Sequence, residues 1–403
     1  MPRKVQTARS TSNQPRRGTR PRLGPLAARL SDVPALNADA LIDDPGIRII
    51  VCCGSGGVGK TTTSAAVALR AAERGRRVVV LTIDPARRLA QSMGLTHLDN
   101  SPRPVVGVDT GNGGALDAMM LDMKRTFDDV VESHASPAKA RQILDNPFYQ
   151  ALSSSFAGTQ EYMAMEKLGQ LYAEASKRGR WDLIVVDTPP SRSALDFLDA
   201  PDRLSSFLDG RLIRILLAPA KGPARLLSVG MSVVTNAVTK VLGGQMLRDL
   251  QTFVAAIDTL FGGFRVRADK TYQLLKDSQT AFVVIASPDD DALREAAFFV
   301  ERLASDGMPL AGLVLNRVAS SAAPGLSAQA ALAAAETLDE DNALTAALLR
   351  LHAERLARVS RERTLRRRFA SAHPTVATAT IAALGSDVHD LQTLREIGAA
   401  LTG

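Results

Sequence analysis

Cysteine is almost absent from this sequence of 403 residues. Its two cysteines, Cys52 and Cys53, are adjacent, so they cannot cross-link distant segments or supply the spaced ligands of a zinc site. Aromatic residues make up only 4% of the chain, which leaves its arginine-rich stretches without interleaved rings for stacking on nucleic-acid bases. We therefore expect no structural zinc, and nucleic acid is a disfavoured partner.

Long apolar runs are also missing. The longest runs have the length of strands, far below the ~20 residues that a membrane helix requires. Arg16 and Arg17 resemble the start of a twin-arginine signal, but no apolar segment follows them. We therefore expect a cytoplasmic protein, with peripheral membrane contact as the alternative.

Acidic residues are absent from residues 1–30, which hold eight lysines or arginines. The net charge of +7 thus belongs to this stretch, and the rest of the chain is close to neutral. Few large apolar side chains are available there to offset the entropy of ordering. We expect residues 1–46 to form a disordered basic tail, solvated rather than docked on anionic lipid or nucleic acid.

The remaining chain alternates strand-like and helical patterns. Apolar, β-branched segments of strand length lie at residues 47–53, 76–83, 181–186, 281–286 and 313–315, with weaker ones at 116–121 and 375–382. Near-continuous apolar strands separated by helices predict an α/β fold with a mostly parallel, doubly wound sheet. In such folds ligands bind at the carboxyl ends of the strands.

Two stretches interrupt this alternation, at residues 123–179 and 201–278, and both are predicted to be helical parts of a subdomain. The second is rich in Leu, Val, Met and Phe. A buried helical layer and an exposed apolar groove explain it about equally well, and its methionines slightly favour an adaptable surface. Residues 319–337 are predicted to be a loop of low complexity, and residues 354–368 an arginine-rich helix with a solvated face.

The most informative motif reads GSGGVGKTT and lies between an apolar strand and an alanine-rich helix. Backbone N–H groups of such a loop converge on phosphate oxygens, a lysine reaches the β and γ phosphates, and a threonine hydroxyl faces Mg²⁺. The same letters contain a dinucleotide fingerprint, but Lys60 and Thr61 suit only a triphosphate with its metal. The predicted ATP-binding residues are Gly54, Ser55, Gly56, Gly57, Val58, Gly59, Lys60, Thr61 and Thr62.

The sequence resembles the arsenite-pump and guided-entry (tail-anchored protein targeting) ATPase family, whose phosphate loop is a deviant Walker A motif. The resemblance rests on this loop and on four further motifs over residues 47–403: TIDPARRLA at 82–90, WDLIVVDTPPS at 181–191, VVIASPDDDALREA at 283–296 and VLNRV at 314–318. The stretch Asp387 to Asp390 resembles an actinobacterial branch. A P-loop NTPase domain over residues 47–403 is therefore implied.

The resemblance also implies roles for single residues. Asp84 matches the first switch aspartate, which orients or activates the attacking water and is the predicted catalytic residue. Asp187 matches the second switch and would hold Mg²⁺ through water, together with the hydroxyl of Thr61. Asn316 matches the residue whose amide reads adenine. ATP and Mg²⁺ are thus the implied ligands.

Departures from the family pattern are equally specific. Ser55 stands where members carry a lysine that reaches the partner's nucleotide, and a hydroxyl cannot supply that cation. The second switch lacks the usual Gly and His, and no set of arsenite-binding thiolates is present. We expect a dimer with a paralogous subunit that retains the lysine.

The leading interpretation is an ATP-hydrolysing dimer whose nucleotide state controls the binding of an apolar client, such as a membrane-protein segment. Three alternatives stay open: the ATPase subunit of an anion transporter, a partition-type scaffold on DNA or membrane, and a regulatory pseudo-ATPase. A required membrane partner, steep salt-dependent DNA binding, and ATP binding without turnover would distinguish them.

Overall fold

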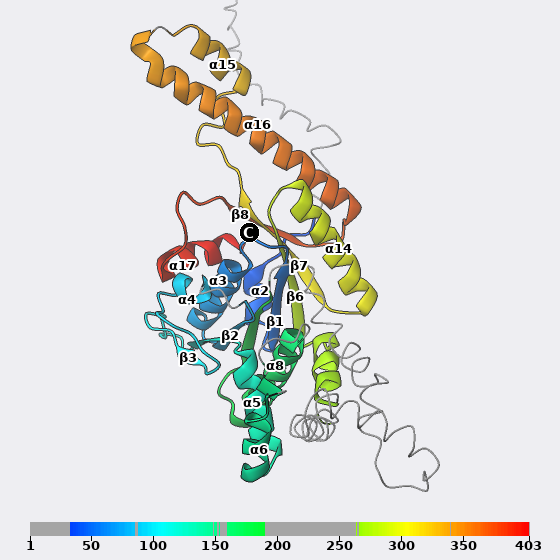
Figure 1. Ribbon diagram of the computed structural model, residues 1–403. Coiled ribbons are helices and arrows are strands. Elements are labelled where there is room, and N and C mark those ends of the chain that lie inside the picture. The colour runs from blue at the N-terminus through cyan, green and yellow to red at the C-terminus, as the bar shows by residue number, and fades with distance from the viewer. Residues whose placement is uncertain are drawn as a thin grey trace, which may run out of the picture.

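The computed structural model describes residues 33–84, 88–147, 149, 150, 153, 159–189, 263, 266–338 and 340–402. An eight-stranded sheet forms the centre of this part of the chain, and helices cover both of its faces (Figure 1). The strands are β1 (Ile49–Gly54), β2 (Arg77–Thr82), β3 (Arg103–Pro104), β4 (Ala115–Met120), β5 (Leu183–Asp187), β6 (Thr280–Ala286), β7 (Leu310–Val318) and β8 (Thr378–Ala382).

The strand order is β3-β4-β2-β5-β1-β6-β7-β8. Every neighbouring pair is parallel except β3 and β4, which are antiparallel. The predicted α/β class with a mostly parallel sheet is thus confirmed. Strand β3 was not predicted, because its two residues are exposed and carry no apolar pattern.

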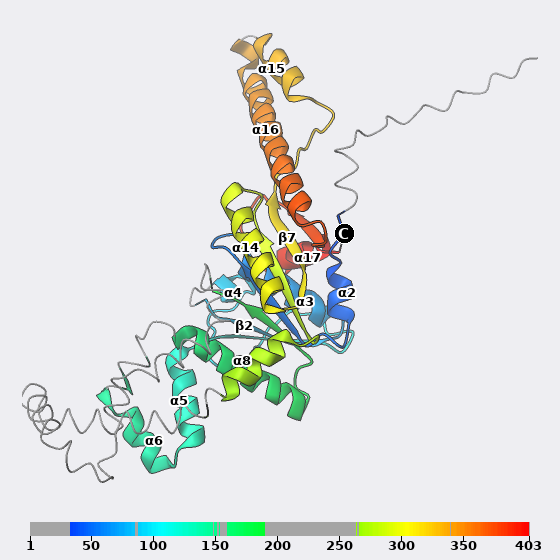
Figure 2. The same cartoon turned by 90° about the vertical axis from the view of Figure 1, so that its right-hand side faces the viewer.

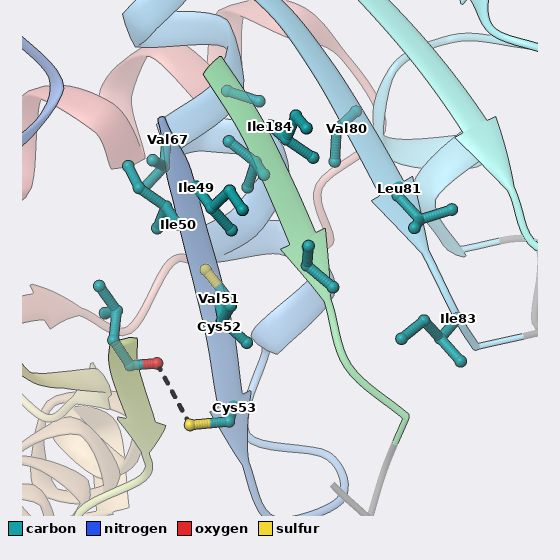
Figure 3. Packing of buried hydrophobic residues seen from close by; sticks show 14 of the residues in the cluster. Ile49, Ile50, Val51, Cys52, Cys53, Val67, Val80, Leu81, Ile83 and Ile184 are labelled. Atoms are coloured by element: carbon teal, nitrogen blue, oxygen red, sulfur yellow. Dashed lines mark hydrogen bonds between the residues drawn. The ribbon is translucent and has the colours of Figure 1, made fainter. Parts of the chain in front are cut away.

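The centre of the sheet shows why its strands read as continuous apolar runs. β1 lies between β5 and β6, and all six of its residues are buried (Figure 3). Cys52 and Cys53 lie in this strand, where the Cys53 thiol donates to the Val283 carbonyl oxygen at 3.7 Å. Burial raises the pKa of both thiols, so they stay protonated and act as small core residues.

Helices α3 and α17 cover one face of the sheet and α14 covers the other (Figures 1 and 2). Small side chains let α3 approach the sheet closely, because Ala65, Ala66 and Ala68 are completely buried. The helices are α2 (Ala38–Asp43), α3 (Lys60–Glu73), α4 (Arg88–Ser92), α5 (Met123–His134), α6 (Pro137–Leu144), α8 (Thr159–Arg178), α14 (Asp290–Asp306), α15 (Ala328–Glu336), α16 (Ala343–Ala372) and α17 (Leu391–Ala400), with a 3-10 turn at Glu340–Asn342.

The predicted boundary of the basic tail is wrong for residues 33–46. Helix α2 forms there and is capped by Asn37, whose side chain accepts from the backbone N–H groups of Asp39 and Ala40. Leu36 and Ile42 are buried in the core, and the Asp39 carboxylate pairs with Arg70 of α3. These contacts explain why the segment is ordered. The remainder of the tail, residues 1–32, lies outside the described residues.

The predicted loop at residues 319–337 is also wrong in its second half, where α15 is capped by Ser327 and packs along α16. Ala331 and Ala335 are buried in this contact. The local Ser, Gly and Pro composition does not predict such a tertiary contact. The expected helix at residues 354–368 belongs to the much longer α16. Together α15 and α16 extend away from the sheet (Figures 1 and 2).

The segment 123–179 contains helices α5, α6 and α8, as its pattern indicated. Most of the segment 201–278 lies outside the described residues, which include only residue 263 and residues 266–278 of it. Of the helices that the structure describes, none combines the length and the apolar character that a membrane span requires.

Candidate functional site

The phosphate loop connects the end of β1 to the start of α3 in the centre of the sheet. Gly57 and Gly59 have φ angles of 77° and 92°, in the left-handed region that favours glycine. A Cβ at Gly59 would lie 2.2 Å from the Asn316 amide nitrogen, and one at Gly54 would lie 2.1 Å from the Ile285 carbonyl oxygen. These three glycines are therefore required by backbone conformation or by close neighbours.

Lys60 begins α3 and is 6% exposed. Its ammonium group donates to the carbonyl oxygens of Gly54 at 2.9 Å and Ser55 at 2.7 Å. These two hydrogen bonds fix the charged group at the phosphate loop. Burial lowers the pKa of Lys60, and the negative charges of Asp187 and Asp84 partly offset this effect. A desolvated cation held at the phosphate loop is suited to bind phosphate oxygens.

Asp187 ends β5 and is fully buried beside the loop. One carboxylate oxygen accepts from the Thr82 hydroxyl at 2.8 Å, and the other accepts no hydrogen bond from the described residues. Burial raises its pKa to about 6, although the Thr82 and Thr61 hydroxyls and the Lys60 charge favour the ionised form. An unsatisfied carboxylate oxygen close to a threonine hydroxyl fits the oxygen ligands that Mg²⁺ prefers.

Asp84 follows β2 and is 8% exposed. It lines a cavity of about 280 Å³ together with the loop and the first turn of α3. The lining residues are Gly57, Gly59, Lys60, Thr61, Thr62, Asp84, Arg88 and Arg317. Five predicted loop residues and the predicted catalytic aspartate therefore share one cavity.

Asn316 lies near the end of β7, on the other side of the loop from Asp84. Its amide nitrogen donates to the Val58 carbonyl oxygen at 2.8 Å, and its amide oxygen accepts from the Arg317 N–H at 2.9 Å. Asn316 also lines a second cavity of about 840 Å³, which α16, α17 and residues 382–389 help to enclose. The predicted adenine contact is thus placed at a cavity with room for a nucleoside, while its amide also holds the loop.

A sequence model of the family described as "Anion-transporting ATPase" matches residues 47–329. The chain belongs to this family. Its relatives include an "Arsenical pump-driving ATPase" of Acidiphilium multivorum, 32% identical over 158 residues, an "ATPase ASNA1 homolog" of Cryptosporidium parvum, 28% identical over 272 residues, and an "ATPase GET3" of Malassezia globosa, 24% identical over 280 residues. The resemblance seen in the sequence is confirmed at the level of this family.

These matches cover different shares of the two chains. The aligned segments make up 39%, 68% and 69% of this chain and 26%, 65% and 75% of the three relatives, in the same order. The chain thus spans about a quarter of the Acidiphilium member of the family and 65% of the Cryptosporidium member.

Three other loop residues of this family member face a different side. Ser55, Gly56 and Val58 line a third cavity with Ser287 and with acidic residues of α14. The Ser55 hydroxyl is buried and has no hydrogen-bond partner among the described residues. Ser55 thus does not line the cavity that holds Lys60 and Asp84, although its carbonyl oxygen accepts from the Lys60 ammonium. The second switch beyond Pro189 lies outside the described residues.

Two arginines of the site were not predicted. Arg88 and Arg317 line both the phosphate-loop cavity and the larger one. Both stood within the motifs TIDPARRLA and VLNRV, which carried the resemblance to the anion-transporting ATPase family. Their chemistry becomes visible only when the fold brings β2, β7 and the loop together.

Proposed function

We propose that this chain binds Mg-ATP and hydrolyses its γ-phosphate. The observation that carries the proposal is that the loop, Lys60, Thr61 and Asp84 line one cavity, with the buried Asp187 beside it. In an anion-transporting ATPase family member, this arrangement supports a phosphoryl-transfer site better than a dinucleotide site. The larger adjoining cavity, lined by Asn316, would take the nucleoside.

Each residue has a role that its position supports. Lys60 and the N–H groups of the loop bind the phosphates, and Asp84 orients the attacking water through its carboxylate. The Thr61 hydroxyl and Asp187, the latter through water, would hold Mg²⁺, which neutralises charge on the phosphates when it is bound. Burial strengthens these electrostatic contacts because little water competes with them.

Asp84→Asn tests the proposed chemistry. The amide keeps the size of the side chain but cannot accept a proton or hold a water as a carboxylate does, so ATP affinity should stay within about threefold while turnover falls at least ~100-fold. Calorimetric titration and phosphate release measure the two quantities. A variant that loses ATP binding but keeps hydrolysing would assign Asp84 to binding instead.

The proposal extends to the assembly and its client. The protein would form a cytoplasmic dimer, peripheral to the membrane, that binds an apolar client. Support comes from the methionine- and leucine-rich sequence of residues 201–278 and from the guided-entry resemblance, which includes the actinobacterial character of residues 387–390. The nucleotide state would alter the exposure of that segment. Hydrogen exchange of residues 201–278 with and without ATP tests this, and equal protection in both states would contradict it.

The replacement of a lysine by Ser55 supports a paralogous partner that retains the lysine. In such a pair each subunit would donate its lysine to the ATP site of the other. Because this chain has Ser55 in place of the lysine, only its own ATP site would receive a lysine from the partner. One fast site and one slow site follow, and adding the partner should accelerate the site that contains Lys60.

A further inference from the structure

Arg317 has an unusual backbone conformation. Its φ angle is 58°, and among the described residues no other residue except glycine has a positive φ. A side chain with a Cβ is disfavoured in this left-handed region, so neighbouring contacts must hold it there. Residues held in this way cluster at functional sites, which makes the surroundings of Arg317 informative.

Those surroundings are the phosphate loop. The Arg317 N–H donates to the Asn316 amide oxygen at 2.9 Å, and its guanidinium donates to the Gly57 carbonyl oxygen at 2.9 Å. The amide nitrogen of Asn316 binds the next loop carbonyl, that of Val58. The left-handed residue in the irregular strand pairing between Leu315 and Val318 of β7 therefore places two neighbouring side chains on successive residues of the loop.

The guanidinium also lies where two cavities meet. Four residues line both the phosphate-loop cavity and the larger one, namely Gly59, Thr62, Arg88 and Arg317. A guanidinium offers five N–H donors, and the bond to Gly57 uses one of them. Among the described residues, no ion pair joins Arg317 to a carboxylate, although Asp84 lines the same cavity.

We propose that Arg317 is a phosphate-binding cation supplied by the same chain, in contact with the phosphates of ATP where they leave the loop toward the nucleoside. The inference rests on the proposed ATP site and adds a residue to it. Arginine is suited to this position because its planar fork can bind a loop carbonyl and phosphate oxygens at the same time. Arg317 thus acts in nucleotide binding, whichever partner supplies a further cation for turnover.

Two variants separate phosphate binding from a purely structural role. Arg317→Gln keeps an N–H donor for Gly57 but loses the charge, whereas Arg317→Lys keeps the charge, and both retain the strained backbone. Calorimetric titration of the full chain with Mg-ATP should show affinity at least ~10-fold weaker for Arg317→Gln, as expected for a lost charge-assisted hydrogen bond. Arg317→Lys should recover part of this loss. Wild-type affinity in Arg317→Gln would overturn the proposal.

A third variant tests whether any loss comes from misfolding. Arg317→Gly removes the guanidinium but relieves the left-handed backbone, so its melting temperature should equal or exceed that of the wild type while its ATP affinity falls as in Arg317→Gln. Wild-type ATP affinity in Arg317→Gly would also contradict the role of Arg317. As a matched control, Arg178→Gln removes an exposed arginine at the end of α8 and should change neither quantity.

Lys60→Ala serves as the reference for the site itself. If Lys60→Ala loses ATP binding and Arg317→Gln does not, the ATP site stands and the role of Arg317 is wrong. If the wild type binds no ATP, the proposed function fails as well. The two failures are therefore distinguishable in one titration series.

Discussion

At the scale of single residues, Asp187 is the most strongly perturbed side chain of the site. Burial raises its pKa from the usual 3.8 to about 6, so above pH 6 the folded protein holds a charge that water would solvate better. The difference corresponds to at most roughly 3 kcal/mol of folding free energy. The carboxylate that we propose to hold Mg²⁺ thus lowers the stability of the protein while no metal neutralises it.

In the absence of nucleotide and Mg²⁺, Asp187→Asn is therefore expected to increase the free energy of unfolding. Because the folded pKa lies above the unfolded one, the folded state binds the extra proton between about pH 4 and pH 6, and wild-type stability falls as the pH rises through that window. The variant should not show this fall in stability, and its free energy of unfolding at pH 8 should exceed that of the wild type by about 1–3 kcal/mol. Urea unfolding in chelator from pH 4 to 8 measures both curves.

The reverse order of stabilities at pH 8 would show that the Asp187 carboxylate is well satisfied in the folded chain. The same variant should lose the Mg²⁺ dependence of ATP affinity, which separates its role in metal binding from its effect on stability.

Residues of the site differ in how far the sequence could predict them. Lys60, Thr61 and the glycines were evident because the loop motif fixes residue type and spacing together. Ser55 and Val58 belong to the same motif, yet they face another cavity, because successive loop residues point in different directions. Arg317 could not be predicted, since its left-handed conformation depends on contacts with residues about 260 positions earlier in the chain.

At the scale of elements, α2 shows how tertiary contacts define the start of the folded domain. The change in charge along the sequence marked the tail, but it could not reveal that Leu36 and Ile42 reach the core. A helix of six residues is too short to be stable alone, so its sequence carries a weak signal. The same holds for α15, whose buried alanines are explained only by α16.

Ile42→Ala tests whether α2 is part of the cooperative fold. Ile42 is 1% exposed, so its truncation should lower the free energy of unfolding by about 2–4 kcal/mol. Asp43→Ala, on the same helix, removes a solvent-exposed pairing with Arg74 and should cost less than about 1 kcal/mol. Chemical denaturation of both variants gives the comparison. Equal, small effects would mean that α2 packs only weakly.

At the scale of the whole molecule, the parallel sheet brings the site together. β2, β5 and β1 are neighbours in the sheet, and Asp84, Asp187 and the phosphate loop follow or occupy their carboxyl ends. This arrangement was predictable, because the carboxyl ends of parallel strands share one edge. The partner and the client were not, since both depend on surfaces rather than on periodic patterns.

The proposed role of a partner lysine leads to a gain-of-function test. Purified alone, the chain should hydrolyse ATP slowly, and Ser55→Lys should raise the rate at least ~10-fold by restoring a cation to the site across a homodimer. The gain should increase with protein concentration as dimers form, and Ser55→Ala should show none. A wild-type chain that is fully active alone, and unaffected by Ser55→Lys, would refute the asymmetric scheme.

The central claim is that this loop and its lysine bind ATP, and calorimetric titration of Mg-ATP into the wild type and Lys60→Ala tests it most directly. Lys60 provides the buried point charge at the phosphate loop, so the account predicts saturable binding to the wild type and no measurable binding to Lys60→Ala. Both proteins should have the same circular dichroism spectrum. Unchanged ATP affinity in a correctly folded Lys60→Ala variant would contradict the account.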